Sequence, residues 1–169
     1  TPVAERARLC AAMTDAMAAM ADDIVPELAW QMGRPVRYGA GELAGFEERA
    51  RHMIAIAEEA LAPVTPAPVD GFRRYVTREP LGLVLVVAPW NYPFLTAVNS
   101  VIPALLAGNA VLLKHAAQTP LVAERFQAAA DRARLPLGLF QHLFLDHTGT
   151  ARLVADGAVD QVNFTGSVA

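Results

Sequence analysis

Short apolar runs that alternate with longer helical segments dominate the sequence after residue 80. Residues 83–88 and 110–113 are runs of Val, Leu and Ala without polar alternation, which is typical of parallel strands buried on both faces. Between them, residues 94–107 form an apolar segment of helical length that stops at Gly108. Strand, helix and strand in this order predict a βαβ unit, the building block of a parallel α/β sheet.

The same alternation continues to the end of the chain. Thr119 and Pro120 are favourable residues for an N-cap and a first helical position, so a helix is predicted from there to about Arg134. Three further elements are predicted: a strand at 139–145, a short helix at 148–155 and a strand at 161–164. From residue 83 onward the sequence therefore predicts repeated βα units with right-handed crossovers.

The preceding residues have a different pattern. Apolar residues recur every three or four positions in 2–30 and in 38–61, which predicts amphipathic helices. Residues 62–70 contain three prolines and are predicted to be a linker or an extended crossing segment. Residues 72–79 alternate bulky and charged side chains, as an exposed strand does. We therefore divide the chain into helices with a crossing segment, an exposed strand, and the first part of a sheet domain, at residues 1–70, 71–80 and 81–169.

Composition and charge argue against several classes of function. The chain has 169 residues, of which 54% are hydrophobic and 18% charged, as in a globular protein with a sizeable core. The net charge is −3 without blocks of like charge, so no nucleic-acid partner is expected. Prolines and asparagines interrupt the longest apolar stretch, so no membrane span is expected. The four histidines lack metal-ligand spacing and Cys10 is the single cysteine, so no metal site is predicted.

The cysteine content and the chain ends lead to two weaker expectations. A single cysteine and the lack of a charged-then-apolar leader favour the cytoplasm. The sequence starts without Met and stops where a helix is expected to begin. We therefore expect it to be part of a longer protein.

Polar residues stand where predicted strands end and helices begin, which is where parallel sheets bind ligands. Lys114 directly follows a strand; its ammonium can donate to ribose hydroxyls or a phosphate, or can simply reach solvent. Gly166 and Ser167 follow the last strand, where free backbone N–H groups favour a phosphate, although a plain strand-to-helix turn has the same pattern. Asn91, between two aromatic residues and two prolines, can either donate to an oxyanion or cap the following helix.

Several motifs occur together in an order and spacing that resemble the NAD(P)-dependent aldehyde dehydrogenase superfamily. They are PLG at 80–82, APWNYP at 88–93, PALLAGNAVLLK at 103–114, TPL at 119–121 and FTGS at 164–167. Further similarity at 5–9 and 32–35 extends the resemblance to essentially the whole chain. The chain corresponds to roughly the first part of a family member.

The resemblance implies a Rossmann-like cofactor domain and the oxidation of an aldehyde to a carboxylic acid with NAD or NADP. It assigns Asn91 to the substrate oxygen and Lys114 to the adenosine ribose. It assigns Gly166 and Ser167 to the start of the helix that faces the cofactor pyrophosphate. The lining of the cofactor cleft is assigned to Ala88, Pro89 and Trp90. The strand predicted at 72–79 would belong to the part that builds homo-oligomers.

The sequence departs from the family pattern in three places. The family's catalytic Cys and general-base Glu lie downstream of the segment that resembles 164–167, and Cys10 does not match that nucleophile. The 169-residue chain is therefore expected to be inactive by itself. Ala117 stands where many NAD-preferring members have a Glu that holds the ribose 2′-hydroxyl, so NADP is expected to be tolerated. Residues 144–147 replace a Gly-rich turn.

Two other functions are compatible with the residues themselves. One is a nucleotide-binding module without catalysis, and the other is a relative that reduces acyl-CoA or acyl phosphates. The sequence does not indicate which aldehyde would be the substrate.

Overall fold

The computed structural model describes residues 1–167, and this part of the chain contains six helices and four strands. In chain order they are α1 (Val3–Ala18), α2 (Ala21–Met32), α3 (Val36–Leu61), β1 (Leu83–Ala88), α4 (Pro93–Leu106), β2 (Ala110–His115), α5 (Pro120–Arg132), β3 (Phe140–Leu143), α6 (His147–Ala155) and β4 (Gln161–Phe164). None of the helices in the described residues is long and apolar enough to cross a membrane.

The four strands form one parallel sheet in the order β3-β2-β1-β4. The predicted α/β class with a parallel sheet is thus confirmed. The chain proceeds from β1 through β2 to β3 in one direction and then returns to place β4 on the free side of β1. A sheet of this kind has a crevice where the direction of winding reverses, and ligands bind there. In this chain the reversal lies between β1 and β4, at the carboxyl end of β1.

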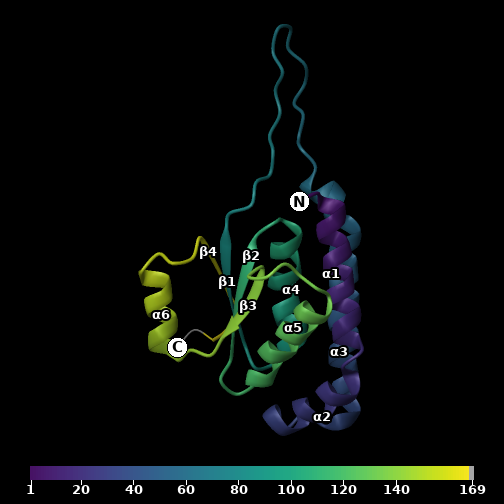
Figure 1. Ribbon diagram of the computed structural model, residues 1–169, viewed down its shortest axis with the longest axis vertical. Helices are drawn as coiled ribbons and strands as arrows, with labels where there is room; N and C mark the ends of the chain where they lie inside the picture. The colour runs from purple at the N-terminus through teal and green to yellow at the C-terminus, as the bar shows by residue number, and fades with distance from the viewer. Residues whose placement is uncertain (168–169) are drawn as a thin grey trace.

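One face of the sheet carries the core. The helices α4 and α5 cover it, α1 and α3 lie outside them, and α6 lies on the other side of the sheet (Figure 1). The strand residues that face the helices are buried, among them Val84, Val86, Val111 and Leu113. Because these strands are apolar and without alternation, they pack on the helices as the sequence pattern predicts.

Residues 62–82 project from the body as an extended two-legged arm (Figure 1), and every one of them is exposed. Its legs are joined by two isolated antiparallel bridges, Val64 with Val76 and Val69 with Phe72. The prediction of a strand at 72–79 is therefore wrong within this chain. The facing leg carries the three prolines, which lack the N–H groups that a continuous ladder needs.

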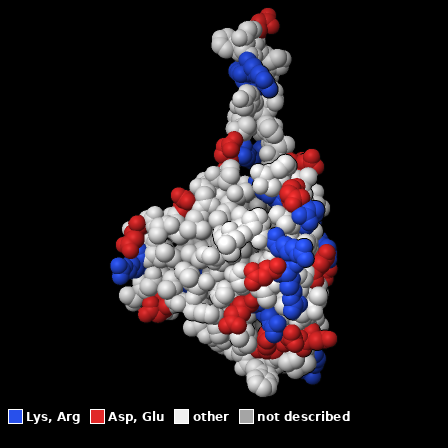
Figure 2. All heavy atoms as spheres, in the orientation of Figure 1, with Lys and Arg blue, Asp and Glu red and all other residues white. Residues whose placement is uncertain are grey.

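Charged side chains gather along the helical side of the body, whereas the middle of the face seen in Figure 2 carries few of them. The arm exposes apolar as well as charged residues. Val64, Phe72, Tyr75 and Val76 are each more than half exposed. An exposed apolar set of this kind is a feature of surfaces that contact other molecules.

Candidate functional site

The carboxyl ends of β1, β2 and β4 lie at the same edge of the sheet because the strands are parallel. Val87 of β1 lies between Lys114 of β2 and Phe164 of β4. The N–H of Thr165 donates to the Val87 carbonyl over 3.0 Å. The hydrogen bonding between β1 and the chain that follows β4 thus continues one residue beyond the end of β4. The segments that leave these strands therefore surround the end of β1, at the reversal of the strand order.

Lys114 reaches this edge from the face opposite the core. Alternate residues of a strand point to opposite faces; Val111 and Leu113 pack against the helices, so Lys114 points to the side of α6. The residue is 7% exposed. Within residues 1–167 its ammonium forms no hydrogen bond or ion pair, and the nitrogen is not among the fully buried polar atoms, so it reaches the surface at the end of a buried side chain. A cation at the end of a mostly buried side chain can bind a ligand that accepts hydrogen bonds or carries negative charge. The position therefore fits a sugar hydroxyl or a phosphate.

Asn91 lies in the loop after β1 and is exposed. The helix α4 begins at Pro93, its N-cap residue is Tyr92, and it has no side-chain cap from its own sequence neighbours. The alternative that Asn91 caps this helix is therefore wrong. Ala88 is buried at the strand end, Pro89 is half-buried and Trp90 is 46% exposed. The Asn91 amide thus remains available at the same edge of the sheet as Lys114.

Gly166 and Ser167 follow β4 and are both exposed. The contact of Thr165 with Val87 places them after the strand that flanks the reversal of the strand order. The helix predicted to begin at these residues lies beyond 167, outside the described part of the chain.

His115 is a site residue to which sequence reasoning assigned no role. It lies opposite Ala88 at the end of β2 and is 4% exposed. Its Nδ1 accepts the N–H of Ala116 over 3.0 Å and lies 3.0 Å from the Thr119 hydroxyl, while Nε2 lies 3.4 Å from the Pro93 carbonyl. An accepting Nδ1 requires the neutral ring with its proton on Nε2. His115 therefore links the end of β2 to the start of α4.

Burial, with a smaller contribution from the nearby Lys114 ammonium, lowers the pKa of His115 to about 4. An unfolded histidine takes up its proton near pH 6.5, so the unfolded state binds more protons than the folded state between pH 6.5 and 4. The stabilisation is complete above pH 6.5 and is lost as the pH falls to 4. We expect His115 to account for about 3 kcal/mol of lost unfolding free energy across this window.

The measurement is urea unfolding at several pH values for the wild type and for His115→Gln, in which this position cannot titrate. Between pH 6.5 and 4, the unfolding free energy of the variant should fall less than that of the wild type. His52, which is exposed on α3, provides the control: His52→Gln should follow the wild type. If the unfolding free energy depended on pH in the same way in His115→Gln and the wild type, His115 would not stay neutral in the fold.

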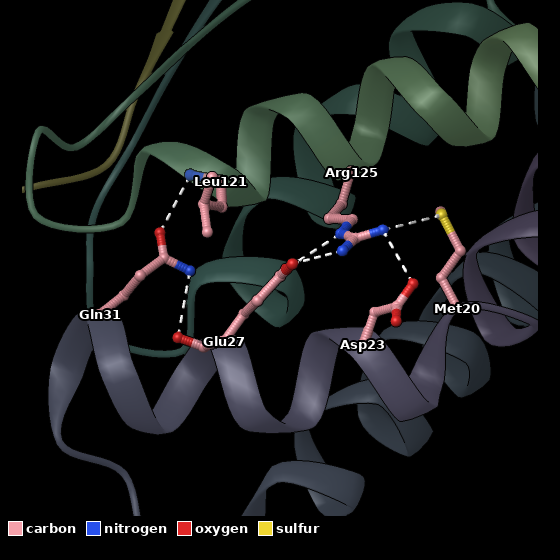
Figure 3. A network of polar contacts seen from close by, with 6 residues as sticks. All are labelled: Met20, Asp23, Glu27, Gln31, Leu121 and Arg125. Carbon is pink, nitrogen blue, oxygen red and sulfur yellow. Dashed lines mark hydrogen bonds and ion pairs between the residues drawn. The ribbon is translucent and has the colours of Figure 1, made fainter.

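The turn between β2 and α5 is held in place by α2 (Figure 3). The side-chain oxygen of Gln31 accepts the N–H of Leu121 over 2.9 Å, which satisfies one of the free N–H groups at the start of α5. One turn further along, Arg125 pairs with Glu27 and lies 3.3 Å from the carboxylate of Asp23. The exposed turn that carries Ala117 is thereby anchored beside Lys114.

The described residues offer neither a metal site nor an activated thiol. No group of three or more His, Cys, Asp or Glu side chains in residues 1–167 could hold a metal ion. Cys10 is buried in α1, and burial raises the pKa of its thiol to about 12. A thiol of this kind stays protonated at neutral pH and is a poor nucleophile.

Comparison with known proteins relates this arrangement to one family. The model of the aldehyde dehydrogenase family matches residues 1–169. An aldehyde dehydrogenase of Paenarthrobacter nicotinovorans is 37% identical over 172 residues, which cover 100% of this chain and 38% of the relative. A succinate-semialdehyde dehydrogenase [NADP(+)] of Mycobacterium avium is 34% identical over 169 residues, 99% of this chain and 36% of the relative.

Solved structures have the same fold. The crystal structure of an NAD-dependent aldehyde dehydrogenase from Sinorhizobium meliloti matches with a TM-score of 0.92 and 30% identity, over 99% of this chain and 34% of that chain. The chain thus spans between a third and two fifths of the length of these relatives. On the match of its full length to the family model, the chain belongs to the aldehyde dehydrogenase family.

Proposed function

We propose that this chain supplies the cofactor-binding part and one oxyanion donor of an enzyme that oxidises an aldehyde to a carboxylic acid with NAD(P)⁺. The observation that carries the proposal is the mostly buried side chain of Lys114, whose ammonium forms no hydrogen bond or ion pair within residues 1–167. It stands at the end of β2, next to β1, the strand beside which the strand order reverses. The free amide of Asn91 follows the neighbouring strand. This combination suits a bound dinucleotide beside a reacting carbonyl.

Each residue has a role in the proposed site. Lys114 donates to the adenosine ribose, and the Asn91 amide donates to the substrate oxygen as negative charge develops on it. The backbone N–H groups at Gly166 and Ser167 face the pyrophosphate, and the end of β1 with its loop lines the cleft at Ala88, Pro89 and Trp90. When bound, NAD(P)⁺ supplies the hydride acceptor.

The nucleophile and the general base are assigned to other parts of the complete enzyme. Cys10 lies in the hydrophobic core on α1, with a pKa that keeps its thiol protonated. We therefore propose that the thiolate that attacks the aldehyde comes from outside this chain and meets Asn91 at the edge of the sheet.

The test is formation of NAD(P)H by the complete enzyme with a panel of aldehydes. Succinate semialdehyde comes first, because the Mycobacterium avium relative carries that substrate in its name. Aldehyde-dependent NAD(P)H formation supports the proposal. Reduction of acyl-CoA or acyl phosphates without aldehyde oxidation would favour a reductase, and cofactor binding without either reaction would favour a binding module.

NADP⁺ is expected to bind with a Kd within about tenfold of that for NAD⁺. Ala117 is exposed in the turn three residues after Lys114, so a ribose 2′-phosphate meets no carboxylate there and has a cation nearby. Ala117→Glu should weaken NADP⁺ binding by roughly tenfold or more, through like-charge repulsion, and leave NAD⁺ binding within about threefold.

Isothermal titration of the complete enzyme with both cofactors measures these values. Gln118→Glu is the matched control, because it adds the same charge at the adjacent exposed position. Wild-type binding of NADP⁺ more than about tenfold weaker than that of NAD⁺ would contradict the role given to Ala117.

The arm at residues 62–82 is assigned to contacts between subunits. All of its residues are exposed, including the apolar side chains of Val64, Phe72 and Tyr75. Contact with a second copy of the enzyme would remove this surface from water. Sedimentation of the complete enzyme as a monomer would contradict this assignment.

A further inference from the structure

We propose that Glu42 is a positioning residue for Asn91: from α3 it holds the start of α4 and thereby the loop that carries the Asn91 amide. The inference rests on the role proposed for Asn91. Glu42 itself lies on another helix and does not contact the reacting atoms.

Glu42 provides the cap that α4 lacks in its own sequence. One carboxylate oxygen, Oε1, accepts the N–H groups of Phe94 and Leu95, each over 3.0 Å. These groups belong to the first turn of the helix, where N–H groups have no partner within the helix. A carboxylate is also favoured there by the helix dipole. The start of α4 is thus fixed by a residue 52 positions earlier in the chain.

The second carboxylate oxygen of Glu42 pairs with Arg34. Glu42 is 2% exposed, so its charge is removed from water and needs compensation. The Arg34 guanidinium supplies it, and also lies 4.6 Å from the ring centroid of Tyr92. Arg34 therefore contacts both the capping carboxylate and the residue that follows Asn91.

Tyr92 has a backbone conformation that needs such support. Its φ of 50° and ψ of 56° lie in the left-handed region, which is costly for a residue with a Cβ and persists only where the surroundings enforce it. Arg34 lies over the ring, Glu42 holds the next two N–H groups, and His115 Nε2 lies 3.4 Å from the Pro93 carbonyl. The backbone directly after Asn91 is held by three side chains, so the direction of its amide depends on them.

The first readout is the activity of the complete enzyme at saturating aldehyde and cofactor. Glu42→Ala should lower kcat by about tenfold or more, because small displacements of a catalytic group are costly, while the KM for NAD(P)⁺ changes by less than about twofold. Glu47→Ala is the matched control: Glu47 is on the same helix and pairs with Arg51 in an exposed position. It should leave kcat unchanged. Glu42→Gln retains an acceptor oxygen and should recover part of the loss.

A double-mutant cycle separates positioning from a general structural effect. If Glu42 acts through Asn91, Glu42→Ala should lower kcat by less than about twofold once Asn91 is already Ala. Losses that multiply in the double variant would overturn the inference. If Glu42→Ala does not fold, the cycle is run with Glu42→Gln and the same criterion.

Hydrogen exchange gives a readout independent of catalysis. In Glu42→Ala, the amides of Phe94 and Leu95 should exchange about tenfold faster or more, while those of β2 stay protected. Unchanged exchange at Phe94 and Leu95 would overturn the inference even without any activity. A wild-type enzyme that oxidises no aldehyde would refute the proposed function instead, and the exchange experiment would still test whether Glu42 holds the loop.

Discussion

Replacing Asn91 by Ala in the complete enzyme is expected to lower kcat by about 10²–10³-fold, equivalent to about 3–4 kcal/mol of transition-state stabilisation. The reason is that the amide donates to an oxygen whose negative charge grows only as the reaction proceeds. Asn91 lies in the loop after β1 and does not cap α4, so its loss should not unravel the helix. The KM for NAD(P)⁺ should change little, because Lys114 and the strand ends hold the cofactor.

Steady-state kinetics with an aldehyde and NAD(P)⁺ measures this effect. Asn91→Asp is a second variant of the same size; it should be at least as impaired as Asn91→Ala, because a carboxylate cannot donate and repels an oxyanion. Gln161→Ala is the control: it removes an exposed amide at the start of β4, the opposite end of the sheet. If Asn91→Asp kept activity within a few-fold of the wild type, a donor role for Asn91 would be excluded.

Phe126→Ala is expected to lower the free energy of unfolding by about 3–5 kcal/mol. Phe126 on α5 is fully buried, and its ring centroid lies 5.7 Å from Phe46 on α3, 5.9 Å from Phe94 on α4 and 6.2 Å from Phe140 on β3. Truncation removes the apolar burial and leaves a cavity among rigid rings.

Urea unfolding of the wild type and the variant gives the difference directly. Leu137→Ala is the control, because Leu137 is fully exposed and its loss should change the unfolding free energy by no more than about 0.5 kcal/mol. A loss below about 1 kcal/mol in Phe126→Ala would mean that the neighbouring rings move to fill the space, and that the aromatic cluster is not the rigid centre of the fold.

Much of the sheet domain can be predicted from local pattern. The apolar run at Leu83–Ala88 predicts β1 with both of its boundaries, and Pro120 marks the first residue of α5. The topology determines where Lys114 and Asn91 lie, because in a parallel βαβ unit the carboxyl ends of both strands are at the same edge of the sheet. Their placement follows from the order of the elements and needs no knowledge of side-chain packing.

The arm illustrates where local pattern is insufficient. Alternation at residues 72–79 predicts a strand, but a strand exists only where a neighbour offers a continuous row of N–H and C=O groups. The leg that faces it is interrupted by prolines, and only two bridges form. The alternation indicates only that successive side chains point to opposite sides. No sheet forms, because the facing leg does not offer a continuous row of hydrogen-bonding groups.

By itself the sequence determined the succession of helices and strands, the parallel sheet and the edge at which Asn91 and Lys114 stand. These features depend on periodicity and on the order of segments, which neighbouring residues encode. Only the tertiary structure identified how the edge is held: Glu42 caps α4 from another helix, His115 reaches the Pro93 carbonyl, and Phe126 joins three elements. Such contacts join residues far apart in the chain, and the packing of the helices on the sheet decides which of these residues meet.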